Sequence, residues 1–441
     1  MNRKLVFFTG LMLFSMFFGA GNLIFPPLLG MEAGNQFLPA ISGFILTGVL
    51  LPFVAVIAVI TSQGGMVEIG SRVHPLFGLV FAIIIYLCIG PFYAIPRAAT
   101  VAYELSWQQM FANDSRLSLI LFVAIFFLIS LLICLNPKKI VDWLGQILTP
   151  LLLITLAILV VRGLFLLEYT GTPATDKYAD SPFLTGFIEG YFTLDAVAGL
   201  AFGVVVINAL RDGGILNRAK QISGAIVSGL IAALGLATVY LSLGWIGAVM
   251  PKTQNYSNGA ELLTAAAQLL FGKTGSLLFG TIVLLACITT VIGLINACGS
   301  FFHSIYPKYS YKTYAVVFTI IGFLISSLGL DFILNIAAPI LLFIYPIAIV
   351  LMALALLEPL IGDGKMMYRI AIAITFVYAA YDSLVSLGLN MDWAAKVLGF
   401  VPFFHLGLGW VVPALFGALL GFAIDKWLTK QDEAMALQKK N

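Results

Sequence analysis

Charged side chains are scarce in this sequence. Asp, Glu, Lys and Arg make up 10% of the 441 residues, whereas hydrophobic residues make up 61%. A soluble domain carries roughly 25% charged residues, and no soluble fold of this length could bury so much apolar surface. A lipid bilayer accepts such a chain, because the outward face of a membrane protein is apolar. The composition therefore excludes an ordinary soluble protein and predicts a polytopic membrane protein.

Cysteine and histidine are also rare, with four and three copies. The cysteines lie in or at the edge of apolar runs without metal-ligand spacing, which is typical of small buried side chains. His74, His303 and His405 are far apart and near loop ends, where we expect interface residues rather than metal ligands. The sequence contains no Ser/His/Asp set and no Gly-rich phosphate loop, so we expect neither an enzyme nor a bound cofactor. The small net charge of +3, with scattered basic residues, argues against a nucleic-acid partner.

Long apolar runs, in contrast, are abundant. A spanning helix needs about 20 mainly apolar residues, and we identify twelve such runs, which predicts an all-α membrane protein with twelve spans. Their approximate ranges are 5–29, 38–62, 76–105, 117–135, 144–167, 185–210, 219–250, 274–305, 313–328, 332–357, 368–387 and 401–427. A further helix near 260–271 is expected outside the bilayer, as a re-entrant or surface segment. The first run is too long for a cleavable signal peptide, so we expect it to be a retained span.

The basic residues of the connecting segments predict the orientation, because cytoplasmic loops of membrane proteins are enriched in Lys and Arg. With the N-terminus inside, sixteen basic residues fall on inner segments and six on outer segments. This bias requires an even number of spans. Both termini are therefore predicted to be cytoplasmic.

Two of the predicted spans contain residues that weaken a helix at membrane depth. The first has Gly-Ala-Gly-Asn at 19–22 followed by Pro-Pro at 26–27, and the sixth has Gly-Tyr-Phe-Thr-Leu-Asp at 190–195. Broken backbone inside a membrane is tolerated only where it lines a cavity or is buried in protein. The freed N–H groups suit a carboxylate, and the freed carbonyls suit a cation. Breaks in the opening spans of two five-helix units of opposite topology indicate a transporter.

These motifs resemble those of the BrnQ family (LIVCS), the bacterial branched-chain amino acid:cation symporters. The resemblance rests on Gly-Ala-Gly-Asn-Leu-Ile-Phe-Pro-Pro at 19–27, Gly-Pro-Phe-Tyr-Ala-Ile-Pro-Arg at 90–97 and Thr-Thr-Val-Ile-Gly-Leu at 289–294. It extends from the N-terminus through the twelfth span. It implies a multi-pass symporter of the bacterial inner (plasma) membrane that imports leucine, isoleucine and valine by alternating access.

The BrnQ family is similar in architecture to the sodium-coupled LeuT-type carriers, so the resemblance also implies a division of the chain. A ten-helix transport core would occupy 1–357, with one inverted repeat at about 5–167 and the other at about 185–357. Two peripheral helices would follow at 358–427, and a polar cytoplasmic tail at 428–441. Membrane lipid would surround the protein, and its oligomeric state is left open.

The same resemblance implies roles for individual residues in substrate binding. The sequence at 19–22 resembles the unwound Gly-x-Gly-Asn of LeuT-type carriers, in which the backbone N–H groups of Ala20 and Gly21 would hold the substrate carboxylate. The residues at 192–194 resemble the Phe-Thr-Leu of their sixth helix, so Phe192 would close the pocket. Tyr93 is a further candidate for the pocket lining.

Sodium is the coupling ion that the resemblance implies. The side chains of Asn22 and Thr193 would coordinate a first sodium ion that touches the substrate carboxylate. The ligands of a second ion would be the hydroxyls of Thr289 and Thr290 and the carbonyl oxygens of Ser15, Phe18 and Ala286. A hard cation prefers such oxygen ligands. Alternatively, the two threonine hydroxyls bond back to their own helix.

Asp195 departs from the LeuT-type pattern, which has a small hydroxyl residue at this place. An ionisable side chain inside a membrane is costly and points to a function. It could pair with the substrate ammonium, carry a proton in a proton-coupled carrier, or be a structural anion that pairs with Arg97 or caps a half-helix. We expect Arg97 to be a structural residue or a gate. A ligand-gated channel or a membrane sensor is the alternative from a different class.

Overall fold

The computed structural model describes residues 2–62, 64–108, 115–169, 171–193, 195–251, 256, 258–362 and 364–438. These residues form helices joined by short connections, and no strand occurs among them. Nine helices in this part of the chain are long and apolar enough to cross a membrane, or ten if the bent pair α12 and α13 forms one span. The prediction of an all-helical protein with many apolar spans is confirmed.

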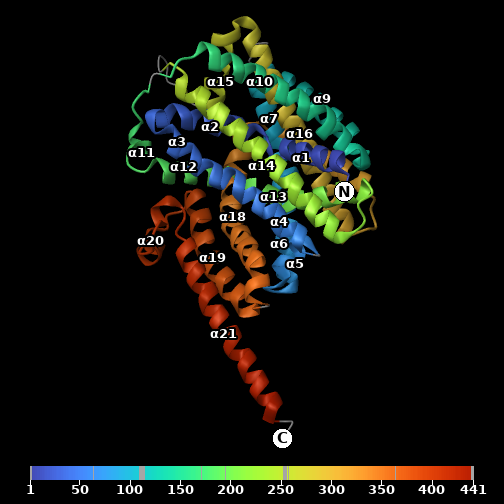
Figure 1. Cartoon of the computed structure of the whole chain (residues 1–441), viewed down its shortest axis with the longest axis vertical. Helices are drawn as coiled ribbons and strands as arrows, with labels where there is room; N and C mark the ends of the chain where they lie inside the picture. Colours follow the sequence, from blue (N-terminus) through green and yellow to red (C-terminus); the bar gives the residue numbers. More distant parts are fainter. Residues whose placement is uncertain are drawn as a thin grey trace. The chain divides into compact units, whose positions relative to one another are not determined.

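The helices follow one another along the chain, and most α-helices are labelled in Figure 1; η denotes a short 3-10 or π segment. Their bounds are α1 (Arg3–Phe17), α2 (Ala20–Ala33), η1 (Gly34–Gln36), α3 (Phe37–Ile45), η2 (Leu46–Leu50), α4 (Leu51–Thr61), α5 (Gly65–Ser71), α6 (Pro75–Leu87), η3 (Cys88–Phe92), α7 (Ala94–Ala102), η4 (Tyr103–Gln108), α9 (Arg116–Cys134), η5 (Pro137–Lys139), η6 (Val141–Leu148), α10 (Thr149–Leu166), α11 (Asp176–Ala179), α12 (Pro182–Tyr191), α13 (Asp195–Asp212), α14 (Arg218–Val249), α15 (Gly259–Phe271), α16 (Lys273–Ile305), α17 (Tyr311–Ser326), α18 (Leu330–Ile361), α19 (Lys365–Ser386), α20 (Asp392–Leu398), η7 (Phe404–Leu406) and α21 (Val411–Gln438).

Each of the twelve predicted runs overlaps one of these helices or a chain of consecutive ones. The structure has fewer separate long helices, because α2 continues through η1 into one apolar stretch, Ala20–Thr61, and because α1 and α17 have only fifteen and sixteen residues. The number of membrane crossings therefore stays a prediction. The predicted tail at 428–441 begins as a continuation of α21, and its last three residues lie outside the described part of the chain.

The chain divides into two compact units. The first comprises Met1–Ile60 and Ile89–Leu334, and the second comprises Thr61–Cys88 and Asn335–Asn441. This division separates parts of the chain that are each internally compact. The predicted division into a transport core and peripheral helices concerns their roles, and it stays a prediction.

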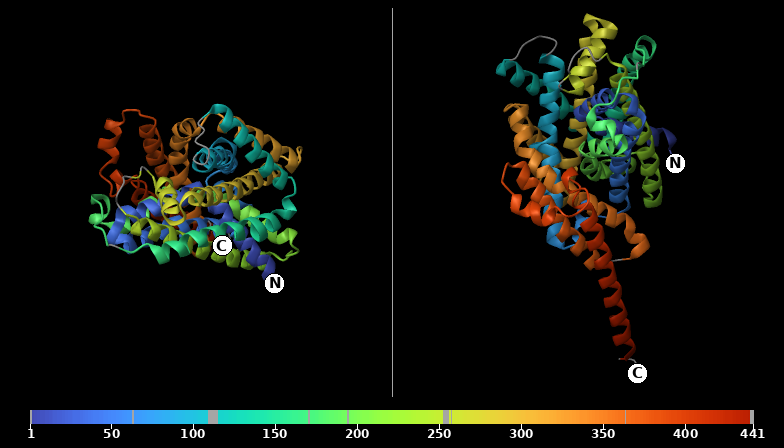
Figure 2. Two further views of the ribbon diagram at one scale, coloured as in Figure 1. Left: turned by 90° about the horizontal axis from the view of Figure 1, so that it is seen from above. Right: turned by 90° about the vertical axis from the view of Figure 1, so that its left-hand side faces the viewer.

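Close contact between backbones determines how the helices of the first unit pack. Helix α14 lies against α1 and α2, and α12 lies against α3 (Figure 1 and Figure 2). A Cβ atom at Gly30 of α2 would lie 1.8 Å from the Gly244 carbonyl oxygen of α14, and one at Gly186 of α12 would lie 1.9 Å from the Ala40 oxygen of α3. Small residues at such positions allow membrane helices to approach closely. Glycine thus sets the spacing of both helix pairs.

One lysine joins the ends of α2 and α12. The Lys177 ammonium lies 3.0 Å from a Glu32 carboxylate oxygen of α2 and 2.8 Å from a Glu189 oxygen of α12. Partial burial lowers the pKa of Lys177, but its hydrogen bonds and charge interactions with Glu189 and Glu32 outweigh this effect, so the net pKa lies above its ordinary value. The backbone N–H of Thr175 also donates to the Glu32 carbonyl. The segment before α12 is therefore fixed to the end of α2.

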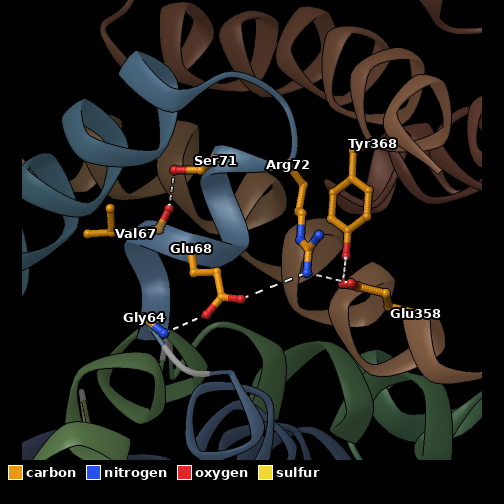
Figure 3. A network of polar contacts seen from close by, with 7 residues as sticks. All are labelled: Gly64, Val67, Glu68, Ser71, Arg72, Glu358 and Tyr368. Carbon is orange, nitrogen blue, oxygen red and sulfur yellow. Dashed lines mark hydrogen bonds and ion pairs between the residues drawn. The ribbon is translucent and has the colours of Figure 1, made fainter. Parts of the chain in front are cut away.

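A polar network holds helices of the second unit together (Figure 3). Arg72 forms an ion pair with Glu358 near the end of α18 and a longer one, at 3.8 Å, with Glu68 of α5. The Tyr368 hydroxyl of α19 donates to the other oxygen of Glu358 at 3.2 Å. Beside this network, the Arg369 Nε donates to the Val73 carbonyl. The network connects α5, α18 and α19 at the segments for which the charge bias predicts a cytoplasmic location.

The close packing of α12 on α3 predicts that Gly186→Ala destabilises the protein. The added methyl group would overlap the Ala40 carbonyl, so the helices must separate, at a cost of about 1–3 kcal/mol. The matched control is Gly163→Ala in α10, where a Cβ atom would meet its nearest neighbour at 3.6 Å. Thermal-shift measurements on purified protein in detergent should show a lower melting temperature for Gly186→Ala alone. Equal melting temperatures for the two variants would contradict the packing argument.

The Lys177 contacts predict a smaller effect at the ends of α2 and α12. Lys177→Met leaves two neighbouring carboxylates without their counter-charge. Because the lysine side chain is 46% exposed, we expect a loss of about 1 kcal/mol or less. Lys177→Arg should retain most of the stability, and 1 M choline chloride should reduce the difference between the variants. The raised pKa implies that the contribution is present below pH 10.5 and is lost as the pH rises above it. A destabilisation of Lys177→Met that salt does not change would point to packing instead.

Candidate functional site

The first predicted break is present and lies between α1 and α2. Phe18 has a ψ of 83°, and Gly19 is extended, with φ −108° and ψ −166°. Helix α2 begins at Ala20, and both Pro26 and Pro27 remain inside it. The first N–H groups of a helix have no carbonyl acceptor within that helix. The N–H groups of Ala20 and Gly21 thus lie in the first turn of α2, and their role in holding a substrate carboxylate stays a prediction.

The second predicted break lies between α12 and α13. Helix α12 ends at Tyr191, α13 begins at Asp195, and the two are bent by 50°. Leu194, the last residue of the Phe-Thr-Leu motif, lies outside the described residues. Phe192 is 38% exposed, and the Thr193 hydroxyl donates to the Gly190 carbonyl at 2.8 Å. Asp195 thus occupies the first turn of a half-helix, where the helix dipole favours a negative charge.

A third interruption occurs where we expected a continuous span. Gly90 has non-helical angles, φ −93° and ψ −121°, and Pro91 follows it. Proline provides no N–H for the helix, and glycine tolerates the irregular backbone. Helix α7 then begins at Ala94 with Tyr93 as its N-cap residue. Two interrupted spans are predicted from the sequence, and the Gly-Pro pair of the third run adds an interruption that was not predicted.

Asn22 connects the two predicted breaks. Its side-chain Nδ2 donates to the Asp195 Oδ2 at 2.7 Å and also hydrogen-bonds to the Tyr240 hydroxyl of α14. Its Oδ1 accepts from the Gly19 N–H at 3.3 Å. Both ends of this buried amide are thus engaged, and the Thr193 hydroxyl also interacts with the Asp195 carboxylate. The role of Asn22 and Thr193 as sodium ligands stays a prediction.

Arg97 brings a positive charge to the same place. Its Nη1 donates to the Tyr93 hydroxyl at 2.8 Å, and its guanidinium carbon lies 5.4 Å from the centre of the Tyr93 ring. Its Nη2 lies 3.7 Å from the position that a Cβ atom would take at Gly21. The charge of Arg97 also acts on Asp195. The site therefore combines a cation, a carboxylate and the first turn of α2.

A second cluster consists of oxygen atoms from α1 and α16. The buried Thr289 hydroxyl lies 3.0 Å from each of the Ser15 and Ala286 carbonyl oxygens and 2.9 Å from the Leu285 oxygen. The Thr290 hydroxyl lies 3.4 Å from the Ser15 oxygen. A Cβ atom at Gly19 would lie 3.1 Å from the Thr290 hydroxyl, so the first break and this cluster are neighbours.

The structure brings the predicted residues into two adjacent groups. Asn22, Thr193 and Asp195 form one, and the threonine pair with the Ser15 and Ala286 carbonyls forms the other. Phe18 is fully buried in the break between them, but its carbonyl oxygen makes no contact that fixes it as a ligand among the described residues.

Two residues, Tyr240 and Arg97, contact the site in ways that the sequence does not predict. Tyr240 was missed, since a tyrosine in an apolar run carries no pattern that distinguishes it from a packing residue. Arg97 was expected to be structural or a gate, and the signal for a site role was its charge within a span. The Tyr240–Asn22 contact and the approach of Arg97 to Gly21 depend on the packing of distant helices, whereas Arg97 contacts Tyr93 locally.

Solved structures with a similar fold are transporters. The chain aligns with Mhp1, a nucleobase-cation-symport-1 family transporter, with a TM-score of 0.61 and 16% identity, covering 97% of this chain and 93% of that one. It also aligns with a manganese transporter from Eremococcus coleocola, with a TM-score of 0.58 and 15% identity, covering 96% and 94% of the two chains. At these identities the likeness establishes the fold alone.

Sequence comparison is more specific. The family model for branched-chain amino acid transport proteins matches residues 2–428. The branched-chain amino acid permease BrnQ of Corynebacterium glutamicum is 43% identical, over 99% of this chain and 98% of its own length. BrnQ of Bacillus subtilis is 39% identical over 96% and 98%, and BraB of the same species is 37% identical over 95% of each chain. The resemblance seen in the sequence motifs is confirmed, and the chain belongs to the branched-chain amino acid transport protein family.

Proposed function

We propose that this protein imports leucine, isoleucine and valine together with sodium, by alternating access, through the membrane of the cell. The observation that carries the proposal is the meeting of two interrupted helices at the Asn22–Asp195 hydrogen bond, next to the oxygen cluster of Ser15, Thr289 and Thr290. The substrate class follows from the relatives, which are permeases for branched-chain amino acids.

Helix packing supports an inverted repeat of five spans. In such a repeat, the first span corresponds to the sixth and the second to the seventh. Helix α2 of the first span packs on α14 of the seventh, and α3 of the second packs on α12 of the sixth, so exchanging the repeats converts one contact into the other. Helix α7 of the third span lies against α16 of the eighth, and α9 of the fourth lies against α17 of the ninth. Because the third span corresponds to the eighth and the fourth to the ninth, exchanging the two repeats leaves each of these two contacts unchanged.

The chemistry of the oxygen cluster supports sodium binding there. Two hydroxyls and two carbonyls converge from α1 and α16, and sodium is a hard cation that takes oxygen ligands. The hydroxyl protons now point to carbonyls, and they can rotate away so that the oxygen lone pairs face an ion. The end of α1 provides the negative end of a half-helix dipole, which also favours a cation.

Two cavities of the first unit support the predicted sidedness. Segments assigned to the outer side surround a cavity of about 900 Å³, whose lining includes Glu104, Arg116 and Glu261. Segments assigned to the inner side surround one of about 340 Å³, lined in part by Lys138 and His303. Loops that the charge bias places on one side thus lie together, which supports the predicted grouping of the loops; the charge bias itself assigns the side of the termini to the cytoplasm.

The direct test is uptake of radiolabelled leucine into proteoliposomes. We expect an inward sodium gradient to drive accumulation, and we expect a pH gradient without sodium to have little effect. Unchanged uptake after replacing sodium with potassium or choline would contradict sodium coupling. Uptake driven by the pH gradient and abolished in Asp195→Asn would establish the proton-coupled alternative instead.

Thr290→Val provides a sharper test of the proposed sodium site. The substitution removes one oxygen ligand and leaves the side-chain volume nearly unchanged, so the sodium concentration for half-maximal uptake should rise about tenfold or more. The control is Thr281→Val on the same helix, where the hydroxyl donates to the Leu277 carbonyl of its own helix. The same sodium dependence in both variants would place the ion elsewhere.

A further inference from the structure

Arg97 presents an electrostatic problem that the packing alone does not solve. It lies in α7, within the apolar stretch Pro75–Gln108, and its side chain is half-buried. A charge within a membrane span costs several kcal/mol unless a partner compensates it. Arginine cannot become neutral in a protein. The guanidinium therefore requires an anion or a set of acceptors at this depth.

The contacts of Arg97 within the protein compensate its charge only in part. The Tyr93 hydroxyl accepts from one of the five N–H donors, and the Tyr93 ring provides a cation–π contact. Within the described part of the chain, no carboxylate oxygen lies within 4.0 Å of the guanidinium. Asp195 acts on Arg97 only as a charge at longer range. The structure thus separates the two opposite charges instead of pairing them directly.

The other face of the guanidinium points toward the first turn of α2. Arg97 Nη2 lies 3.7 Å from the Cβ position of Gly21, and glycine leaves the backbone there uncovered. The Asp195 carboxylate lies on the Asn22 side of the same turn, held by the Asn22 amide. A positive group beside Gly21 and a negative group bound to the Asn22 side chain therefore both lie against the first turn of α2.

We propose that Arg97 is the counter-charge for the α-carboxylate of the transported amino acid, while Asp195 receives the α-ammonium. This inference rests on the proposed function and specifies how its substrate is recognised, as a zwitterion with both groups free. An α-amino acid carries its two charges on groups bonded to one carbon, so it can compensate both protein charges at once. The planar guanidinium fits a carboxylate with two parallel hydrogen bonds, and the Tyr93 contact holds it in position.

The wild-type protein allows a first test without any substitution. Leucinamide keeps the ammonium group but lacks the carboxylate charge, and 4-methylpentanoate keeps the carboxylate but lacks the ammonium. Each should compete with leucine at least about 100-fold more weakly than unlabelled leucine does, because each leaves one buried charge uncompensated. Leucinamide that competes as well as leucine would overturn the proposal.

Arg97→Gln then assigns the carboxylate to this residue. We expect its affinity for leucine to fall about 10- to 100-fold, as for the loss of a charge-assisted hydrogen-bonded pair, and its affinity for leucinamide to change less than about threefold. The preference for leucine over leucinamide should therefore collapse. Arg97→Lys should retain part of the preference, because it keeps the charge but not the paired hydrogen bonds.

A structural role for Arg97 would give a different result. Leucine and leucinamide would then both bind more weakly by the same factor, and the preference for leucine would remain.

Gly21→Ala provides a second test that does not remove a charge. Its methyl group would meet Arg97 and the Phe25 ring at ordinary contact distances of 3.7 and 3.6 Å, so the protein should fold, but the methyl would occupy the approach to the guanidinium. Leucine affinity should fall in this variant more than leucinamide affinity, and equal affinity losses would contradict the proposal.

The matched control is Arg162→Gln, which removes an exposed arginine that lies over the Phe271 ring at 4.7 Å. It should leave leucine affinity unchanged. The outcomes also separate this inference from the proposed function. Wild-type protein that neither binds nor accumulates leucine would refute the function, whereas leucine transport with an unaltered preference in Arg97→Gln would refute only the role of Arg97.

Discussion

The interrupted backbone at Phe18 and Gly19 is the constraint on which the rest of the site depends. In apolar surroundings, every N–H and carbonyl freed from a helix needs another partner. The Ser15 carbonyl at the end of α1 meets the hydroxyls of Thr289 and Thr290, and the Gly19 N–H meets the Asn22 side chain. The first N–H groups of α2 have no acceptor within their own helix. One break therefore generates an oxygen-rich end suited to a cation and an N–H-rich end suited to a carboxylate.

The position of these ends depends on close helix packing. The glycine contacts hold α2 against α14, which carries Tyr240, and they hold α12 against α3 just before the second break. Lys177 ties the C-terminal end of α2, through Glu32, to the last turn of α12, through Glu189. Asn22 and Asp195 can meet across 173 residues of chain because both half-helices are fixed in this way. The carboxylate of Asp195 and the guanidinium of Arg97 are then held apart, and this separation is what an amino acid zwitterion can bridge.

Much of this arrangement could be predicted from the sequence. The scarcity of charge indicates the membrane, the Gly-Ala-Gly-Asn motif locates the first break, and the family motifs identify the threonine pair. The third break at Gly90 was not predicted, although Gly-Pro is the chemical reason for it. The contact of Tyr240 with Asn22 and the approach of Arg97 to Gly21 could not be predicted, because they depend on the rotation and spacing of distant helices rather than on a local pattern. The proposed inverted repeat has no evident counterpart in similarity between the two halves of the sequence, and its support comes from which helices touch.

The most direct test of whether the two breaks enclose the binding site is to ask whether substrate protects a cysteine at position 192 from chemical modification. Phe192 is 38% exposed, and the four native cysteines are buried, so a charged thiol reagent should react mainly with a Phe192→Cys variant at that position. In a variant that still transports leucine, we expect saturating leucine with sodium to slow the modification at least severalfold. Modification at the same rate with and without leucine would contradict the account, because the substrate would then bind away from the interrupted helices.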